Sequence, residues 1–238
     1  MSREAATSRP SVIIVGGGLA GLAAGCYAQM SGMRSTVLER HVLPGGCCTA
    51  WGRDGYIFDY CIEWLLGTAA GNEANQVWRE LGALDGKEIT NFEMFNRVVG
   101  ADGRSVTFYN DPDRLERHLL EVSPADAPVL RSFCQDLRLF LEADLLSFLT
   151  PPSLRTAREE REAEIKAAPV RSVLERTSAT RLEDFTARLR DPLLRRAFPN
   201  IFFQDHESFP LLPYLLNMAA ANHGNAGVPQ GGSLGPGR

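Results

Sequence analysis

The sequence has no apolar run long enough to cross a membrane and no segment with the layout of a signal peptide. The apolar run that follows the polar N-terminal arm is far too short. Acidic residues interrupt LFLEADLLSFL, and prolines interrupt FPLLPYLLNMAAA. We therefore expect a cytoplasmic protein whose contact with a membrane is at most peripheral.

Cysteine spacing, histidine spacing and charge exclude several further classes. The five cysteines are odd in number and contain no C-x-x-C pair, so neither a disulfide framework nor a zinc site is expected. The four histidines are scattered without metal-ligand spacing, and we expect no metal. A net charge of −4 gives no basic surface for nucleic acid. A redox role for the adjacent Cys47 and Cys48 is the lesser alternative to reduced thiols packed near the cofactor.

The strongest positive signal is SVIIVGGGLAGLAAGCYAQMSGMRSTVLER at residues 11–40. Residues 12–15 are predicted to form a strand buried on both faces, and residues 36–38 a second strand, with a slim alanine-rich helix between them. Gly16, Gly18 and Gly21 fit the motif G-x-G-x-x-G. The first glycine allows a tight turn, the second a close approach of the backbone to a pyrophosphate, and the third close packing of the helix on the strand. The helix N-terminus offers N–H groups to phosphates.

Glu39 ends the second strand, 18 positions after Gly21. A carboxylate there can accept hydrogen bonds from a ribose 2′-hydroxyl and would repel a 2′-phosphate, which favours FAD or NAD over NADP. Gly45 and Gly46 then offer a second close backbone approach, where NAD-binding domains normally enter another helix. This favours FAD, with an NAD-dependent dehydrogenase as a lesser alternative.

These segments resemble a known family. VIIVGGGLAGLAAG, VLER, PGGCCTAW and GYIFDYCIEWLLG are similar to the N-terminal FAD segment of the phytoene desaturase, carotenoid isomerase and retinol saturase group of flavin-dependent oxidoreductases. The resemblance implies hydride transfer to or from flavin N5 on an apolar, unsaturated, isoprenoid-like substrate. Two departures are that Cys47 and Cys48 replace an arginine, and that Glu63 replaces a frequent histidine. Glu63 is the catalytic candidate. We expect it to form a carboxylate cluster with Asp54 and Asp59 by the isoalloxazine; the alternative for Asp59, on a strand-like segment, is a structural role.

The middle of the chain is predicted to be mainly helical, with one hairpin at FNRVVGADGRSVTFYN, residues 95–110. Asp111, Ser123 and Asp191, each followed by proline, are predicted to cap helices, and residues 155–168 to form a solvated polar helix or mobile segment. The resemblance implies that this region walls an apolar tunnel; the alternative is that its aromatic residues form the core. The aromatic candidates are Phe198, Phe202, Phe203, Phe209 and Tyr214.

The last residues, GVPQGGSLGPGR, resemble the family's return to the FAD domain, where Ser233 would cap a helix that Gly-Pro-Gly then prevents. We therefore expect an apparently truncated α/β fold, with a Rossmann-like FAD-binding segment at 1–67, a helical substrate region at 68–222 and a truncated return at 223–238. A second chain or self-association could complete it. The alternative function is a non-catalytic fragment or partner subunit that binds flavin weakly or not at all. The predicted FAD-binding residues are Gly16, Gly17, Gly18, Leu19, Ala20, Gly21, Glu39, Arg40, Gly45, Gly46 and Cys47.

Overall fold

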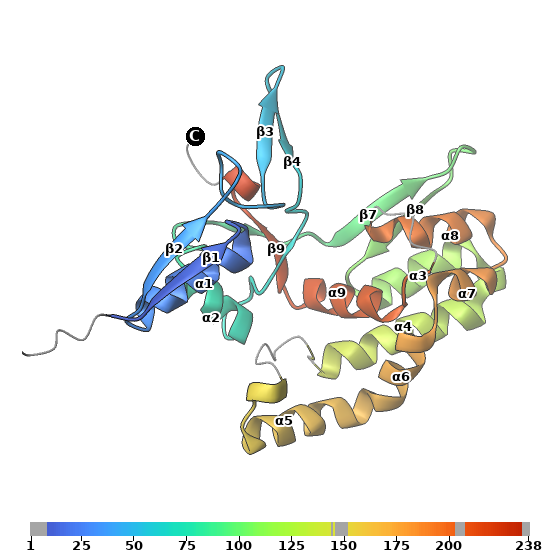
Figure 1. The fold of residues 1–238 in the computed structure, drawn as a ribbon. Coiled ribbons are helices and arrows are strands. Elements are labelled where there is room, and N and C mark those ends of the chain that lie inside the picture. The colour runs from blue at the N-terminus through green and yellow to red at the C-terminus, as the bar shows by residue number, and fades with distance from the viewer. Residues whose placement is uncertain (1–8, 144, 146–151, 203–207, 235–238) are drawn as a thin grey trace, which may run out of the picture. The chain divides into compact units, whose positions relative to one another are not determined.

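The computed structural model describes residues 9–143, 145, 152–202 and 208–234 (Figure 1). The chain divides into two compact units. Unit 1 comprises residues 1–64, 77–89 and 228–238, and unit 2 comprises residues 65–76 and 90–227. Among the helices of the described residues, none is long and apolar enough to cross a membrane.

Unit 1 begins with the predicted β-α-β unit. Strands β1 (Ser11–Val15) and β2 (Arg34–Leu38) pair in parallel, with Val15 opposite Leu38, and helix α1 (Leu19–Met30) connects them. Helix α1 ends before Gly32, whose positive φ of 81° suits glycine and not a residue with a Cβ. The α/β fold class and this Rossmann-like unit are confirmed.

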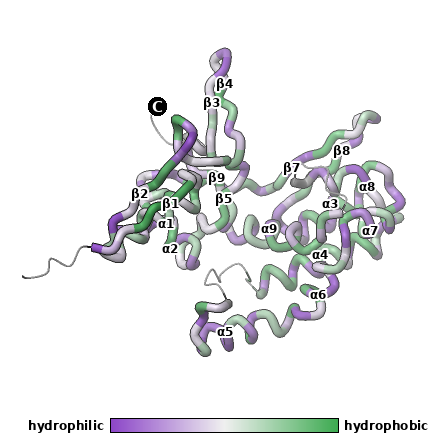
Figure 2. The backbone as a smooth tube through the Cα atoms, in the orientation of Figure 1, coloured by the Kyte–Doolittle hydropathy of each residue, from purple (hydrophilic) through white to green (hydrophobic). Residues whose placement is uncertain are grey.

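The prediction that β1 is buried on both faces is wrong. Ile14 packs under α1, but the alternate residues Ile13 and Val15 are 70% and 87% exposed, and Leu38 on β2 is 52% exposed. Successive side chains of a strand point to opposite faces, and α1 covers one face of this sheet. Within the described residues the sheet has two strands, and the side chains on its other face are exposed. Strand β1 is drawn largely green, as apolar, in Figure 2.

Unit 1 also contains a hairpin that was not predicted. Strands β3 (Ala50–Arg53) and β4 (Tyr56–Asp59) pair antiparallel around Asp54 and Gly55, which both have positive φ, 52° and 81°. Two central residues of positive φ define the two-residue turn that joins tight hairpins, and Asp-Gly is a strong signal for it. That signal was present in WGRDGYIF.

Three short strands form a further small sheet. Strand β5 (Leu65–Leu66) pairs antiparallel with β9 (Ala226–Pro229) in a three-stranded sheet that also contains β6 (Ile89–Thr90). Helix α2 is Glu73–Glu80. Its last residue, Glu80, accepts a hydrogen bond of 2.6 Å from the Tyr27 hydroxyl on α1.

Unit 2 contains the predicted hairpin, β7 (Met94–Val99) with β8 (Ser105–Tyr109), followed by helices. The helices of this unit are α3 (Pro112–Val122), α4 (Ala127–Ala143), α5 (Ala157–Ala167), α6 (Arg171–Ala179), α7 (Leu182–Ala187), α8 (Pro192–Ala197) and α9 (Leu212–Asn222). Single 3-10 turns lie at Pro124–Asp126, Pro152–Leu154, Ala168–Val170 and Phe198–Phe202, and one in unit 1 at Gly232–Leu234.

Two of the three predicted caps are confirmed. The carboxylates of Asp111 and Asp191 accept hydrogen bonds from backbone N–H groups in the first turns of α3 and α8. The predicted cap at Ser123 is wrong, because its hydroxyl donates to the Asp126 carboxylate at 2.8 Å instead. Asp126 is buried and also accepts from the backbone N–H of Arg190 at 2.7 Å, so its side chain joins two segments.

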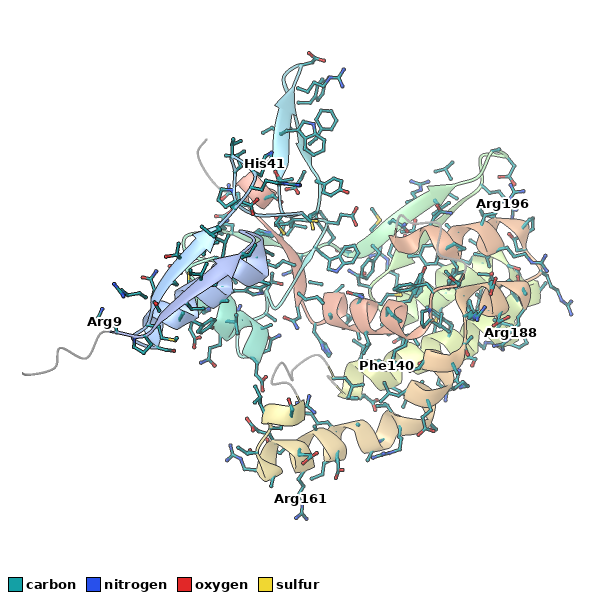
Figure 3. The ribbon with its side chains drawn as sticks, in the orientation of Figure 1. Arg9, His41, Phe140, Arg161, Arg188 and Arg196 are labelled. Atoms are coloured by element: carbon teal, nitrogen blue, oxygen red, sulfur yellow. The ribbon has the colours of Figure 1, made fainter. Side chains whose placement is uncertain are left out.

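The core of unit 2 is built around Phe198, which is fully buried. Its ring makes edge contacts with Phe108 and Phe185 at centroid distances of 5.1 and 5.0 Å, and Phe133 lies at 5.3 Å. Phe140, labelled on α4 in Figure 3, belongs to the same buried cluster. Helix α5 buries none of its residues, as predicted for a solvated polar helix.

The aromatic residues proposed for a tunnel have different environments. Phe198 and Tyr214 belong to the hydrophobic core, with exposed fractions of 0% and 1%. Phe209 is 38% exposed and packs against Tyr214. The side chain of Phe202 and all of Phe203 lie outside the described residues. For Phe198 and Tyr214 the structure therefore supports the core alternative.

Candidate nucleotide site

The first glycine turn, residues 16–18, joins β1 to α1 in unit 1. Gly16 has φ of 108°, and its N–H donates to the carbonyl of Leu38 at 2.7 Å, which extends the β1–β2 pairing into the turn. Gly21 lies so close to the Gly16 carbonyl oxygen that a Cβ there would collide with it. Two of the three glycines therefore have the steric roles predicted for them, the tight turn and close helix packing.

Glu39 lies directly against this turn. Its carboxylate accepts hydrogen bonds from the Gly17 N–H at 2.6 Å and the His41 N–H at 2.8 Å. These bonds, that from His41 foremost, hold the pKa of Glu39 below its usual value, so the carboxylate is ionised at neutral pH. The side chain is exposed, with Oε2 accepting from Gly17 and Oε1 from His41, and each carboxylate oxygen has acceptor capacity left for ribose hydroxyls.

The second glycine turn, residues 45–46, meets the first. The Gly45 N–H donates to the Gly17 carbonyl at 2.8 Å, and Gly18 and Gly45 form a parallel bridge. A Cβ built on Gly46 would lie 3.0 Å from the Gly18 Cα, and both glycines of this turn have positive φ, 126° and 61°. Two backbone segments thus approach each other more closely than side chains would allow.

The two turns and Glu39 make an arrangement that a dinucleotide fits. The first N–H groups of α1 have no partners within the helix and form its positive end, and no acidic residue occupies that first turn. The glycines leave the turn free of side chains, and Glu39 offers acceptors beside it. The chemistry of this donor and acceptor set suits a phosphate next to a ribose.

The other predicted cofactor residues lie around the two turns and are exposed. Leu19 and Ala20 form the first residues of α1, and Arg40 follows Glu39. Cys47 follows the second glycine turn. Figure 3 labels His41, whose backbone N–H is one of the two donors to Glu39.

Asp54 does not join Asp59 in the predicted carboxylate cluster. Asp54 lies in the turn of the β3–β4 hairpin, at the opposite end from Asp59. The Asp59 carboxylate binds the last described segment of the chain. It accepts hydrogen bonds from the backbone N–H and the hydroxyl of Ser233, at 2.6 and 2.7 Å. This contact agrees with the structural alternative for Asp59. Its partner, Ser233, was not predicted, because a contact between residues 174 apart leaves no local sequence signal.

Glu63 lies in the segment between β4 and β5. Its side chain is exposed, yet neighbouring atoms remove enough water to raise the pKa of its carboxyl above the usual value. A raised pKa brings a carboxyl closer to the range in which it can exchange protons near neutral pH.

Among the described residues, no group of three histidine, cysteine or acidic side chains is arranged to hold a metal.

Residues 14–81 match a family described as an NAD(P)-binding Rossmann-like domain. The chain is 26% identical over 190 residues to a lycopene-forming phytoene desaturase of Paracoccus sp., covering 79% of this chain and 36% of that protein. It is 26% identical over 148 residues to human all-trans-retinol 13,14-reductase, covering 59% and 24%, respectively. It is 35% identical over 75 residues to a chloroplastic prolycopene isomerase of an Oncidium hybrid cultivar, covering 32% and 13%. The resemblance stated from the motifs is confirmed.

Solved structures share the fold. An oxidoreductase from Methanosarcina mazei superposes with a TM-score of 0.53 and 17% identity, covering 94% of this chain and 46% of that one. A putrescine oxidase variant gives a TM-score of 0.50 with 15% identity, covering 96% and 49%. The chain thus spans about a third or less of the length of these curated relatives, and less than half of each solved structure.

Proposed function

We propose that this chain binds FAD and forms part of a flavin-dependent oxidoreductase that acts on an apolar, unsaturated, isoprenoid-like substrate. The observation that carries the cofactor proposal is the junction of the two glycine turns beside an ionised Glu39. The substrate class rests on the names of the relatives, which are phytoene desaturase, prolycopene isomerase and all-trans-retinol 13,14-reductase. The bound flavin would supply hydride transfer at N5.

The residues of this chain would bind and orient the cofactor. The N–H groups of the first glycine turn and of α1 would hold the pyrophosphate, with Leu19 and Ala20 as the first helical residues. Glu39 would accept from the ribose, and the second glycine turn, with Cys47 after it, would line the other side. Arg40 would lie beside the ribose. Glu63 is the candidate for holding a proton near the substrate, supported by its raised pKa.

A titration with FAD, followed by flavin absorbance and fluorescence, tests the cofactor proposal. Glu39→Gln should weaken FAD binding about tenfold to a hundredfold, because hydrogen bonds to a charged group contribute about 1.5–3 kcal/mol each. Glu88→Gln is the matched control, since Glu88 is an exposed glutamate of unit 1 away from the turns. Equal binding by the two variants, or no FAD uptake by the unaltered chain, would refute the proposal.

Adenosine nucleotides give a more specific test of Glu39. The unaltered chain should prefer AMP over adenosine 2′,5′-bisphosphate, because the carboxylate repels a 2′-phosphate. Glu39→Gln should lose most of that preference while keeping the shape of the site. A preference that is unchanged in the variant would show that Glu39 does not contact the ribose.

A second candidate function is a nucleotide-binding subunit without catalysis of its own. It is favoured by the exposed apolar residues Ile13, Val15 and Leu38, since such a surface on a sheet is normally covered. The two candidates differ in colour and redox behaviour. Stoichiometric flavin absorbance that bleaches with dithionite supports the oxidoreductase, whereas colourless protein that takes up no added FAD supports the second candidate.

A further inference from the structure

Three of the five cysteines gather at the base of the β3–β4 hairpin in unit 1. Cys47 and Cys48 precede β3, and Cys61 follows β4. The hairpin pairs Ala50 with Asp59, and the Tyr60 N–H then donates to the Thr49 carbonyl at 3.0 Å. The pairing therefore continues beyond the two strands.

Counting one residue further along both strands brings Cys48 and Cys61 to the same level of the hairpin base. The ladder ends there, because the Thr49 N–H donates to the Cys47 carbonyl at 2.9 Å and the Cys61 N–H donates to the Asp59 carboxylate at 3.2 Å. The contact between the two cysteines is made by their side chains, since a hydrogen bond joins the Cys48 and Cys61 thiols. Disulfides span Cα separations of roughly 4.4–6.8 Å.

The side chains agree with this register. The pKa of the Cys48 thiol is raised to about 11, first by burial and next by a side-chain hydrogen bond with Cys61. Cys48 is partly buried, whereas Cys61 and Cys47 are exposed. Cys47 is next to Cys48 in sequence, yet it is one residue out of register with Cys61.

We propose that Cys48 and Cys61 are a matched thiol pair that small-molecule disulfides, such as oxidised glutathione, convert to an intrachain disulfide. The exposed Cys61 sulfur, after losing its proton to solvent, attacks one sulfur of oxidised glutathione and releases one glutathione thiolate. Cys48 then gives its proton to solvent and attacks the Cys61 sulfur, which expels the second glutathione thiolate. The protein loses two hydrogens, and one oxidised glutathione becomes two reduced glutathiones.

This cross-link would act on the second glycine turn. That turn ends two residues before Cys48 and is bound to the first turn through the Gly45 N–H. Asp59, two residues before Cys61, is bonded to Ser233. Oxidation would therefore fasten the glycine turn to the end of β4. The proposal goes beyond the proposed function, because the exchange needs no flavin.

Peptide mapping of the oxidised chain tests the pair. Trypsin separates residues 41–53, with both Cys47 and Cys48, from residues 54–79, with Cys61. After equilibration in a glutathione redox buffer, we expect these two peptides to be linked. The link should persist in Cys47→Ser and be lost in Cys48→Ser and Cys61→Ser.

Repeating the oxidation in strong denaturant shows whether the fold, and not proximity in sequence, selects Cys48 as the partner of Cys61. In the unfolded chain, Cys47 and Cys48 lie at nearly the same separation from Cys61, so linkage should be about equal. In the folded protein, linkage through Cys48 should exceed linkage through Cys47 about tenfold or more, because the register raises its effective concentration. A folded protein that links Cys47 equally well, or carries only a glutathione adduct on Cys61, would overturn the proposal.

Discussion

Gly21→Ala is expected to destabilise unit 1, although alanine is the better helix former. Gly21 lies in α1, where exchanging glycine for alanine contributes about 1 kcal/mol of helix stability. Against this gain, the new Cβ would collide with the backbone carbonyl oxygen of Gly16, which cannot rotate away. Relief requires α1 to move away from the glycine turn.

The matched variant is Gly25→Ala, one turn later on the same helix. Its Cβ would lie 3.2 Å from the Val37 Cγ2, a side-chain methyl group that can move by a few tenths of an ångström. We expect the helix gain and this small strain nearly to cancel. For Gly21→Ala, the collision is with rigid backbone, so the overpacking cost is expected at the upper end of the usual range, about 3 kcal/mol, and the net loss at about 2 kcal/mol.

Tryptophan fluorescence is the assay, because the three tryptophans, Trp51, Trp64 and Trp78, all belong to unit 1. A loss of about 2 kcal/mol lowers the midpoint of thermal unfolding by roughly 10 °C in a unit of this size. Gly25→Ala should unfold within about 3 °C of the unaltered chain. If the two variants unfold at the same temperature, the close packing of Gly21 on the turn is refuted.

Three further predictions concern unit 2, where urea unfolding followed by far-ultraviolet circular dichroism reports the helices. Burial lowers the pKa of His118, whose Nε2 accepts from the Thr107 N–H. The free energy of unfolding should therefore fall as the pH falls below about 6.5, the pKa of histidine in the unfolded chain. His118→Gln should lack this pH dependence of stability between pH 7 and 5. Asp126→Ala should cost about 3 kcal/mol, because it leaves buried donors without acceptors, and a cost below 1 kcal/mol would contradict that account. Phe198→Ala should cost about 3–5 kcal/mol, and Phe209→Ala, at a 38% exposed ring, under half as much; equal losses would contradict the core assignment.

Local patterns predicted the β-α-β unit, the hairpin β7–β8 and the caps Asp111 and Asp191. Each of these depends on residues within a few positions of one another, so its signal is carried by short segments. The β3–β4 hairpin had the same kind of signal in Asp54-Gly55, but the hairpin was not predicted from it. The failed cap at Ser123 shows the limit of such patterns, because distant Arg190 and Asp191 hold the Asp126 carboxylate in a place where the Ser123 hydroxyl donates to it.

From sequence alone one obtains the glycine spacing and the carboxylate after the second strand, because turn geometry and strand alternation are properties of neighbouring residues. Only the tertiary structure places Glu39 on the Gly17 N–H, brings the two glycine turns together, and brings the Cys48 and Cys61 thiols into contact. It also exposes Ile13 and Val15, whose apolar character predicted burial. Whether an apolar side chain is buried, and which distant group it meets, depends on strand register and on what covers each face. Strand register and the cover of each face both depend on contacts between distant segments, so a single segment does not encode them.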